Sequence, residues 1–220
     1  QIGRGAEEFA LHVRGLELAQ HDPRSLNSLA VAYATYPRGA CHPGCSHYLE
    51  RHGVADIGYA KALPRQDPAG KGRMVAQLQD YAGLFNSLKV CQFIMPGTLG
   101  QDLVRYLNLT TGWDVTLEEL LTIGERASNL KRMYNVRLGQ SRQDDVLPRR
   151  ILEEALPGGG AGNYLPPFEA MLEEYYATRG WDANGIPTPE TLRRLGLEWT
   201  IPDLPPPSSP SPIEGEGGDG

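Results

Sequence analysis

The sequence is poor in the features that mark three large classes of protein. Its 220 residues contain only three cysteines, an odd and sparse set that does not suit the disulfide framework of a secreted domain. There is no apolar run long enough to span a bilayer, and no signal peptide is in view. Lysine and arginine number 21 against 27 acidic residues, which does not favour the basic face that nucleic acid requires. We therefore expect a cytoplasmic protein that binds neither membrane nor nucleic acid.

The sequence does contain enough apolar residues for a core. Hydrophobic residues make up 40% of the chain, and its length suits one large domain or two small ones. Its first residue is Gln1 rather than Met, so we expect a processed start or a piece of a longer protein. From Pro202 onward the chain is rich in Pro, Ser, Gly and acidic residues, which cannot bury apolar area. We expect a mainly α fold over residues 1–201 and a disordered tail over residues 202–220.

Apolar residues repeat at helical spacing along much of the chain. The first such stretch begins at Asp22 and Pro23, which suit the N-cap and the first helical position, and it ends before Pro37. Glycines and a proline predict a loop over residues 38–45, and a glycine run predicts a linker over residues 158–162. The stretch 9–13 is either a short strand or an extended segment. Further helices are expected at about residues 71–88, 99–107, 116–138, 165–178 and 188–195.

The clearest helix covers residues 116–138. Thr116 and Glu119 have the spacing of a capping box, and Gly139 suits the position just beyond the C-terminus. A buried seam is expected on this helix at the positions that repeat with helical period, namely Leu120, Ile123, Ala127, Leu130 and Tyr134.

Two cysteine environments could carry chemistry. Cys41 and Cys45 lie in one loop with His47 and resemble half of a zinc site, although a closed zinc site usually takes ligands from two segments. Cys91 lies in an apolar stretch and is either a buried structural cysteine or one of the roughly four thiolates that a cubane cluster needs. If it is a ligand, the other three must come from outside this chain. His42 either transfers protons near neutral pH or lies in solvent.

Several strings of residues, in order along the chain, resemble one known family. They are HVRGLEL and DPR at residues 12–18 and 22–24, RGACH at 38–42, RQDDVLPRR at 142–150 and YYATRGWD at 175–182. Together they resemble the C-terminal part of the aldehyde ferredoxin oxidoreductases, which are tungsten- or molybdenum-pterin enzymes.

The resemblance implies a fold and an activity. It implies irregular helical domains of the type found at the C-terminal end of this family, with the N-terminal pterin-binding domain absent or supplied as a separate subunit. The implied reaction oxidises small aldehydes to carboxylic acids and passes electrons through a 4Fe–4S cluster to ferredoxin. The implied metal centre is a tungsten or molybdenum bis-pterin. We expect this chain to be inactive without the missing part.

The resemblance also implies roles for particular residues. Cys91 matches the fourth ligand of the cluster, at the end of a motif that reads Asp-x-x-Gly-Leu-Cys in the family and NSLKVC at residues 86–91 here. Lys89 stands where the family has Gly. His42 matches a histidine beside the metal, a candidate proton donor or acceptor. The implied cofactor-binding residues are Gly44, Asn86, Val90 and Gln92.

Two other hypotheses come from different classes. The chain could be a non-enzymatic helical interaction module or accessory subunit that has kept the fold, because Asn86 and Lys89 replace the Asp and Gly of the pterin motif. It could also be a small zinc protein that uses Cys41, Cys45 and His47.

Overall fold

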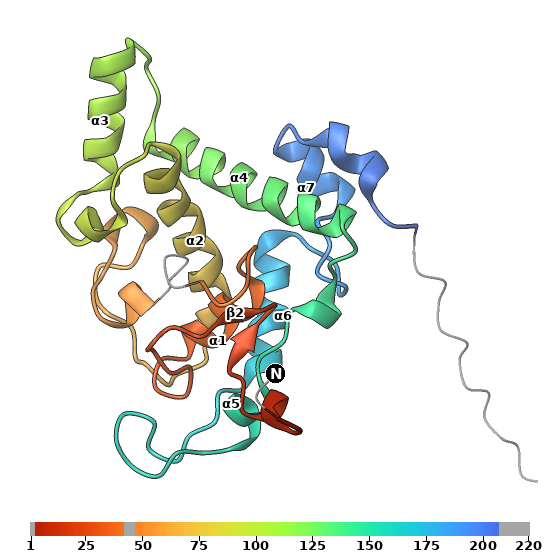
Figure 1. Ribbon diagram of the computed structural model, residues 1–220. Coiled ribbons are helices and arrows are strands. Elements are labelled where there is room, and N and C mark those ends of the chain that lie inside the picture. The colour runs from red at the N-terminus through yellow and green to blue at the C-terminus, as the bar shows by residue number, and fades with distance from the viewer. Residues whose placement is uncertain (1–2, 42–46, 207–220) are drawn as a thin grey trace, which may run out of the picture.

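The computed structural model describes residues 3–41 and 47–206. Helices dominate this part of the chain (Figure 1), which confirms the mainly α class. The two strands form one short antiparallel hairpin in which His12 pairs with Glu17 and Val13 with Leu16. The elements in chain order are η1 (Ala6–Glu8), β1 (His12–Val13), β2 (Leu16–Glu17), α1 (Ser28–Thr35), η3 (His47–Glu50), η4 (Ala55–Ile57), α2 (Lys71–Ser87), η5 (Gln92–Gly97), α3 (Gly100–Thr111), α4 (Leu117–Arg137), η6 (Arg142–Asp144), α5 (Arg149–Glu153), α6 (Phe168–Arg179), α7 (Pro189–Arg194) and η7 (Glu198–Asp203).

Helix α1 lies at the centre of the core, and all eight of its residues are buried. It ends where expected, because Tyr36 before Pro37 is extended. Its predicted start was wrong. The carboxylate of Asp22 accepts hydrogen bonds from the backbone N–H of Arg24 at 2.8 Å and from its guanidinium, so Asp22 closes a turn, and the helix begins at Ser28.

Helix α2 lies between α1, α4 and α6 (Figure 1). Two glycines allow the backbones to approach closely. A Cβ on Gly72 of α2 would lie 2.3 Å from the carbonyl oxygen of Met171 in α6, and one on Gly124 of α4 would lie 2.3 Å from that of Asp80 in α2. These two contacts fix how α2 is placed against its neighbours.

Helix α4 begins as predicted but buries a different face. Thr116 and Glu119 form the expected capping box, and Gly139 has a φ of 94° at the expected position after the helix. Of the predicted seam, however, only Leu120 is buried. The buried residues of α4 also include Gly124, Asn129, Arg132, Met133 and Val136. Several of these are small or polar, because they meet the α2 backbone and the ion pairs of the C-terminal region rather than an apolar wall.

A buried carboxylate, Asp145, joins four parts of the chain. It is fully buried. One oxygen accepts a hydrogen bond from Arg132 of α4 at 2.9 Å, and the other accepts one from Tyr176 of α6 at 2.6 Å. Arg14, in the turn between β1 and β2, donates to it at 3.3 Å, and Gln140 donates at 3.2 Å. Burial, together with the negative charge of Asp145, raises the pKa of Tyr176.

The C-terminal region adds a second, smaller core. Helix α7 is capped by Thr188, as predicted, and Leu192, Leu195 and Leu197 pack with Met133 of α4. The chain continues past residue 201 in η7, and Leu204 still packs against this cluster. The rest of the predicted tail, from residue 207, lies outside the described residues. Among residues 3–41 and 47–206, no helix is both long and apolar enough to cross a membrane.

Candidate functional site

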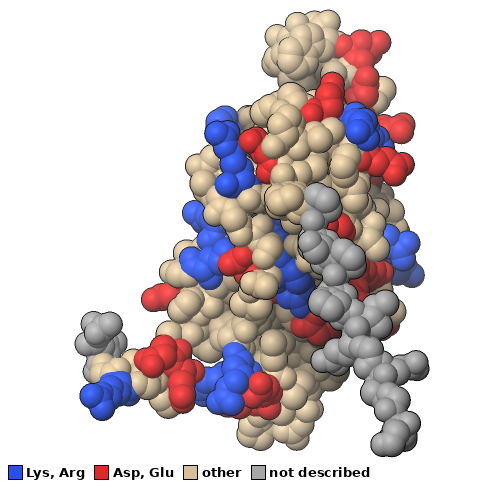
Figure 2. Space-filling view, turned by 90° about the vertical axis from the view of Figure 1, so that its right-hand side faces the viewer, with Lys and Arg blue, Asp and Glu red and all other residues tan. Residues whose placement is uncertain are grey.

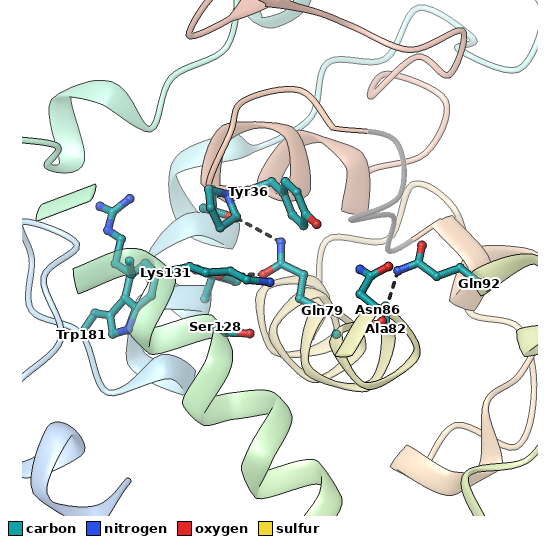
Figure 3. Close-up of a pocket in the computed structure, with 13 residues that line it drawn as sticks. Tyr36, Gln79, Ala82, Asn86, Gln92, Ser128, Lys131 and Trp181 are labelled. Atoms are coloured by element: carbon teal, nitrogen blue, oxygen red, sulfur yellow. Dashed lines mark hydrogen bonds between the residues drawn. The ribbon is translucent and has the colours of Figure 1, made fainter. Parts of the chain in front are cut away.

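A pocket lies between the end of α1, the C-terminal half of α2 and the middle of α4 (Figure 3). Its interior volume is about 30 Å³, far below the range of about 300–1,000 Å³ that is typical of small-molecule sites, so it is a narrow hollow rather than an enclosed ligand cavity. Asn86 and Gln92, two of the predicted cofactor-binding residues, both line it. Gln92 reaches back over α2 and donates a hydrogen bond to the carbonyl oxygen of Ala82 at 3.2 Å (Figure 3).

The segment after Asn86 ends α2 in a defined way. The backbone N–H of Lys89 donates to the carbonyl oxygen of Asn86 at 3.2 Å, and that of Val90 donates to Phe85 at 2.8 Å. This pair of bonds is the Schellman arrangement, which places one residue in the left-handed region. Here that residue is Lys89, with a φ of 60°. The turn therefore explains why glycine suits this position, and it fixes the direction in which the chain leaves the helix towards Cys91.

Cys91 is exposed and unpaired. It immediately precedes η5, and its neighbour Val90 packs against the main core. The backbone beside Cys91 is thus anchored while its thiol is accessible. A cysteine that binds a cluster held mainly by another part of the protein would need both properties. No group of three His, Cys, Asp or Glu side chains that could hold a metal occurs in the part of the chain that the structure describes.

The other predicted site residues lie in or beside the gap in the described chain. His42, Gly44 and Cys45 fall outside the described residues. Cys41, just before them, is buried, and its Sγ accepts a hydrogen bond from Nε of Arg38 at 3.0 Å. The loop that carries these residues follows Pro37, which itself lines the pocket of Asn86 and Gln92. The described end of the loop and the Cys91 motif therefore border the same pocket.

A fixed hydrogen-bond network forms the floor of the pocket. Oε1 of Gln79 accepts hydrogen bonds from the hydroxyl of Tyr175 at 2.8 Å and from Arg179 at 3.0 Å. The fully buried Arg179 also pairs with Asp80, whose carboxylate accepts a hydrogen bond from Ser128 at 2.7 Å. Burial disfavours the charge on Arg179, but the charge of Asp80 and the contacts with Tyr175 together outweigh it and raise the pKa of the guanidinium. The network therefore holds Gln79, Ser128 and Tyr175 of the lining against an ion pair that lies behind it.

Other residues, for which the sequence carries no motif, complete the wall. Lys131 of α4 is exposed at the pocket, and Trp181 and Tyr36 add aromatic surface (Figure 3). Gln79 and Asn86 are seven residues apart on α2, so they share one helix face. This spacing could have indicated from the sequence that Gln79 lies near Asn86. No sequence pattern indicates that Lys131 and Trp181 line the same pocket, because their positions depend on how α4 and α6 pack.

The described lining suits binding more than proton transfer. It contains three carboxamides, one lysine and several hydroxyls, which can donate to and accept from the edge of a polar heterocycle. None of the described lining residues is a His, Cys, Asp or Glu, the side chains that most often transfer protons near neutral pH. These donors and acceptors suit the edge of a pterin-like ring, but a hollow of about 30 Å³ does not enclose one.

The described residues thus form a helical region with an amide-lined hollow, and within residues 3–41 and 47–206 one thiol, that of Cys91, is exposed. A family model described as "Aldehyde ferredoxin oxidoreductase, domains 2 & 3" matches residues 1–197, and the chain belongs to this family.

Curated relatives agree with this assignment. The tungsten-containing aldehyde ferredoxin oxidoreductase of Pyrococcus furiosus is 35% identical over 194 residues, which cover 88% of this chain and 32% of the relative. That of Thermococcus kodakarensis is 34% identical over the same shares of the two chains. An "aliphatic sulfonate oxidoreductase, WOR-like subunit" of Pyrococcus furiosus is 27% identical and is covered to 29%. The chain therefore spans about a third of the length of these relatives.

One solved structure shares the fold. The active-site complex BamBC of benzoyl coenzyme A reductase aligns with 90% of this chain and 34% of its own, with a TM-score of 0.62 and 20% sequence identity. At this identity the likeness concerns the fold alone.

Proposed function

We propose that this chain is the C-terminal portion of an oxidoreductase that converts aldehydes to carboxylic acids and delivers electrons to ferredoxin. In the reaction an aldehyde and one water yield a carboxylic acid, two protons and two electrons. The relatives are tungsten-containing enzymes of that name, and the exposed Cys91 beside an amide-lined pocket is the observation that carries the proposal.

Each predicted residue takes a part that its chemistry allows. Cys91 would supply one thiolate to a 4Fe–4S cluster, and the remaining ligands would come from the N-terminal portion. Asn86 and Gln92 would hold a pterin through their carboxamides, and Val90 and Gly44 through backbone groups. His42 would give or take a proton at the substrate. When bound, the tungsten or molybdenum bis-pterin and the cluster would supply the two-electron chemistry and the path for the electrons.

The test compares the chain alone with a reconstituted complex. The chain is co-expressed anaerobically with the N-terminal two-thirds of the Pyrococcus furiosus relative, and iron content, visible absorption and aldehyde oxidation are measured. We expect iron and activity in the complex and neither in the chain alone. Cys91→Ser should remove most of the cluster absorption, whereas Cys41→Ser, at a buried cysteine with an Arg38 contact, should keep it. A full 4Fe–4S spectrum and activity from the isolated chain would refute the proposal.

A second candidate is a helical interaction module without catalysis. The observation that favours it is the described pocket lining, which lacks any side chain that titrates near neutral pH. This candidate predicts a stable complex with a partner that contains neither iron nor tungsten, and whose formation does not change in Cys91→Ser. Metal analysis of the purified complex separates the two functions.

A further inference from the structure

Helix α4 carries a stripe of apolar residues that stay partly or largely exposed in the described chain. Ile123, Leu130, Tyr134 and Leu138 recur at intervals of seven, four and four residues, so they lie along one face of the helix and its C-cap. They are exposed by 38%, 37%, 65% and 70%. We call these four residues the α4 stripe. Large exposed apolar patches of this kind mark interaction surfaces.

The other faces of α4 are occupied. On one side Gly124 and Ser128 meet Asp80 of α2, and on another Met133 packs against the leucines of the C-terminal core. Figure 1 shows α4 running above α2 towards α7, with α3 beside its first turn. The stripe is the remaining face, and it has the periodic pattern of a helix built to be buried.

The α4 stripe is continuous with the candidate site. Lys131, next to Leu130 in the chain, lines the pocket of Asn86. At the other end Leu138 borders a second hollow with Pro37 and Arg38, which lead into the loop of His42. A partner that covers the stripe therefore also closes over the pocket and the described edge of that loop.

We propose that the α4 stripe is the docking surface for the N-terminal portion of the oxidoreductase, on the same chain or as a separate subunit. This inference rests on the proposed function. The relatives are about three times as long as the matched region, and the family model covers domains 2 and 3, so a further domain exists in the family to occupy it. A second copy of this chain would cover the pocket with another incomplete site and would add only a second Cys91 thiolate, short of the roughly four that a cluster needs.

The charges around the stripe define the chemistry of its partner. Lys131 lies beside Leu130 and is exposed, whereas Arg137, beside Leu138, already pairs with Asp203 of this chain at 3.9 Å. The docking face of the partner should therefore be apolar at its centre and acidic at its rim, because a desolvated cation needs an opposite charge. Salt should slow association more than it speeds dissociation.

The test measures binding between the chain and the N-terminal two-thirds of the Pyrococcus furiosus relative. The double variant Leu130→Glu, Tyr134→Glu and the single variant Tyr134→Glu are compared with Leu109→Glu, which places one such charge on α3 at a residue that is 74% exposed. Figures 1 and 2 both show the end of α3 projecting at the top of the molecule, away from the site. Circular dichroism and thermal melting check that each variant folds; if the double variant does not fold, Tyr134→Glu alone is used, since that side chain is mostly in solvent.

We expect at least a tenfold rise in Kd for the stripe variant and less than a twofold change for Leu109→Glu. Equal affinities for all four proteins, or no binding by the wild-type chain, would overturn the docking surface. So would a wild-type chain that dimerises in solution and loses its dimer in the stripe variant. The iron content of the complex is measured separately. If the stripe variant still forms a complex that contains the cluster, only the docking surface is refuted. If binding depends on the stripe but the complex contains no iron, the proposed function is refuted.

Discussion

Lys89 occupies a backbone conformation that suits glycine far better than lysine. Its φ of 60° places it in the left-handed region, where a Cβ costs about 1–2 kcal/mol. The family motif has glycine at this point, and the Schellman bonds of Phe85 and Asn86 show why. Lysine here does not abolish the turn, because its side chain extends into solvent; it weakens the turn.

Lys89→Gly should therefore stabilise the protein. We expect a gain of about 1 kcal/mol in the free energy of unfolding, reduced somewhat by the greater freedom of glycine in the unfolded chain. Urea unfolding monitored by circular dichroism measures it. The matched control is Gly139→Lys, at the equivalent position of α4, where the same two backbone bonds form and φ is 94°. It should lose a similar amount. Unchanged stability in both variants would show that the turns are not strained.

At the scale of elements, the sequence predicted where helices lie better than which face they bury. Helices α2, α4, α6 and α7 were found within a few residues of their predicted bounds, because caps such as Thr116 and Thr188 and terminal glycines act locally. The start of α1 was misplaced since Asp22 and Pro23 fit a tight turn as well as a helix start. The seam of α4 was assigned to the wrong face because apolar periodicity reports that a face is buried, not whether this chain or a partner buries it.

The close backbone contact between α2 and α4 gives the second prediction. Gly124→Ala would set a methyl group 2.3 Å from the carbonyl oxygen of Asp80, so the helices would have to separate. We expect a loss of about 1–3 kcal/mol, despite the better helix propensity of alanine. Gly83→Ala, within α2 and with no atom within 4 Å of the added carbon, should instead gain up to about 1 kcal/mol.

Thermal melting of the two glycine variants decides between packing and propensity. If helix propensity alone governed these sites, both variants would melt above the wild type. A Gly124→Ala protein as stable as Gly83→Ala would mean that α4 is not held against α2 at this contact.

At the scale of the whole molecule, the site could be predicted only in part. Asn86, Cys91 and Gln92 are neighbours along the chain, so a short motif is enough to identify them together. Lys131 and Trp181 joined the pocket only through the packing of α4 and α6. Seen on one face, acidic and basic side chains are interspersed around broad uncharged areas (Figure 2). Which of those areas would contact a partner depends on the surface of the partner as well as on this one.

Asp145 decides how the separate segments are held together. Its carboxylate contacts Arg14 of the hairpin, Arg132 of α4 and Tyr176 of α6, and it has no exposure to solvent. Asp145→Asn keeps the shape of the side chain but removes the charge, so it leaves two buried or partly buried guanidinium groups without their counter-ion. Breaking a buried ion pair in this way costs about 3–5 kcal/mol, a large part of the stability of a domain this size.

We therefore expect Asp145→Asn to lower the free energy of unfolding by about 3–5 kcal/mol, and to do so cooperatively, because the hairpin, α4 and α6 lose a shared contact at once. Asp144→Asn is the neighbouring control. Its side chain accepts one backbone hydrogen bond from Ser141, which an amide oxygen can still accept, so its loss should stay within about 1 kcal/mol. Urea denaturation followed by tryptophan fluorescence is sensitive to Trp181, the buried one of the three tryptophans, which lies against Arg132. Equal midpoints for the two variants would mean that Asp145 does not hold these segments together.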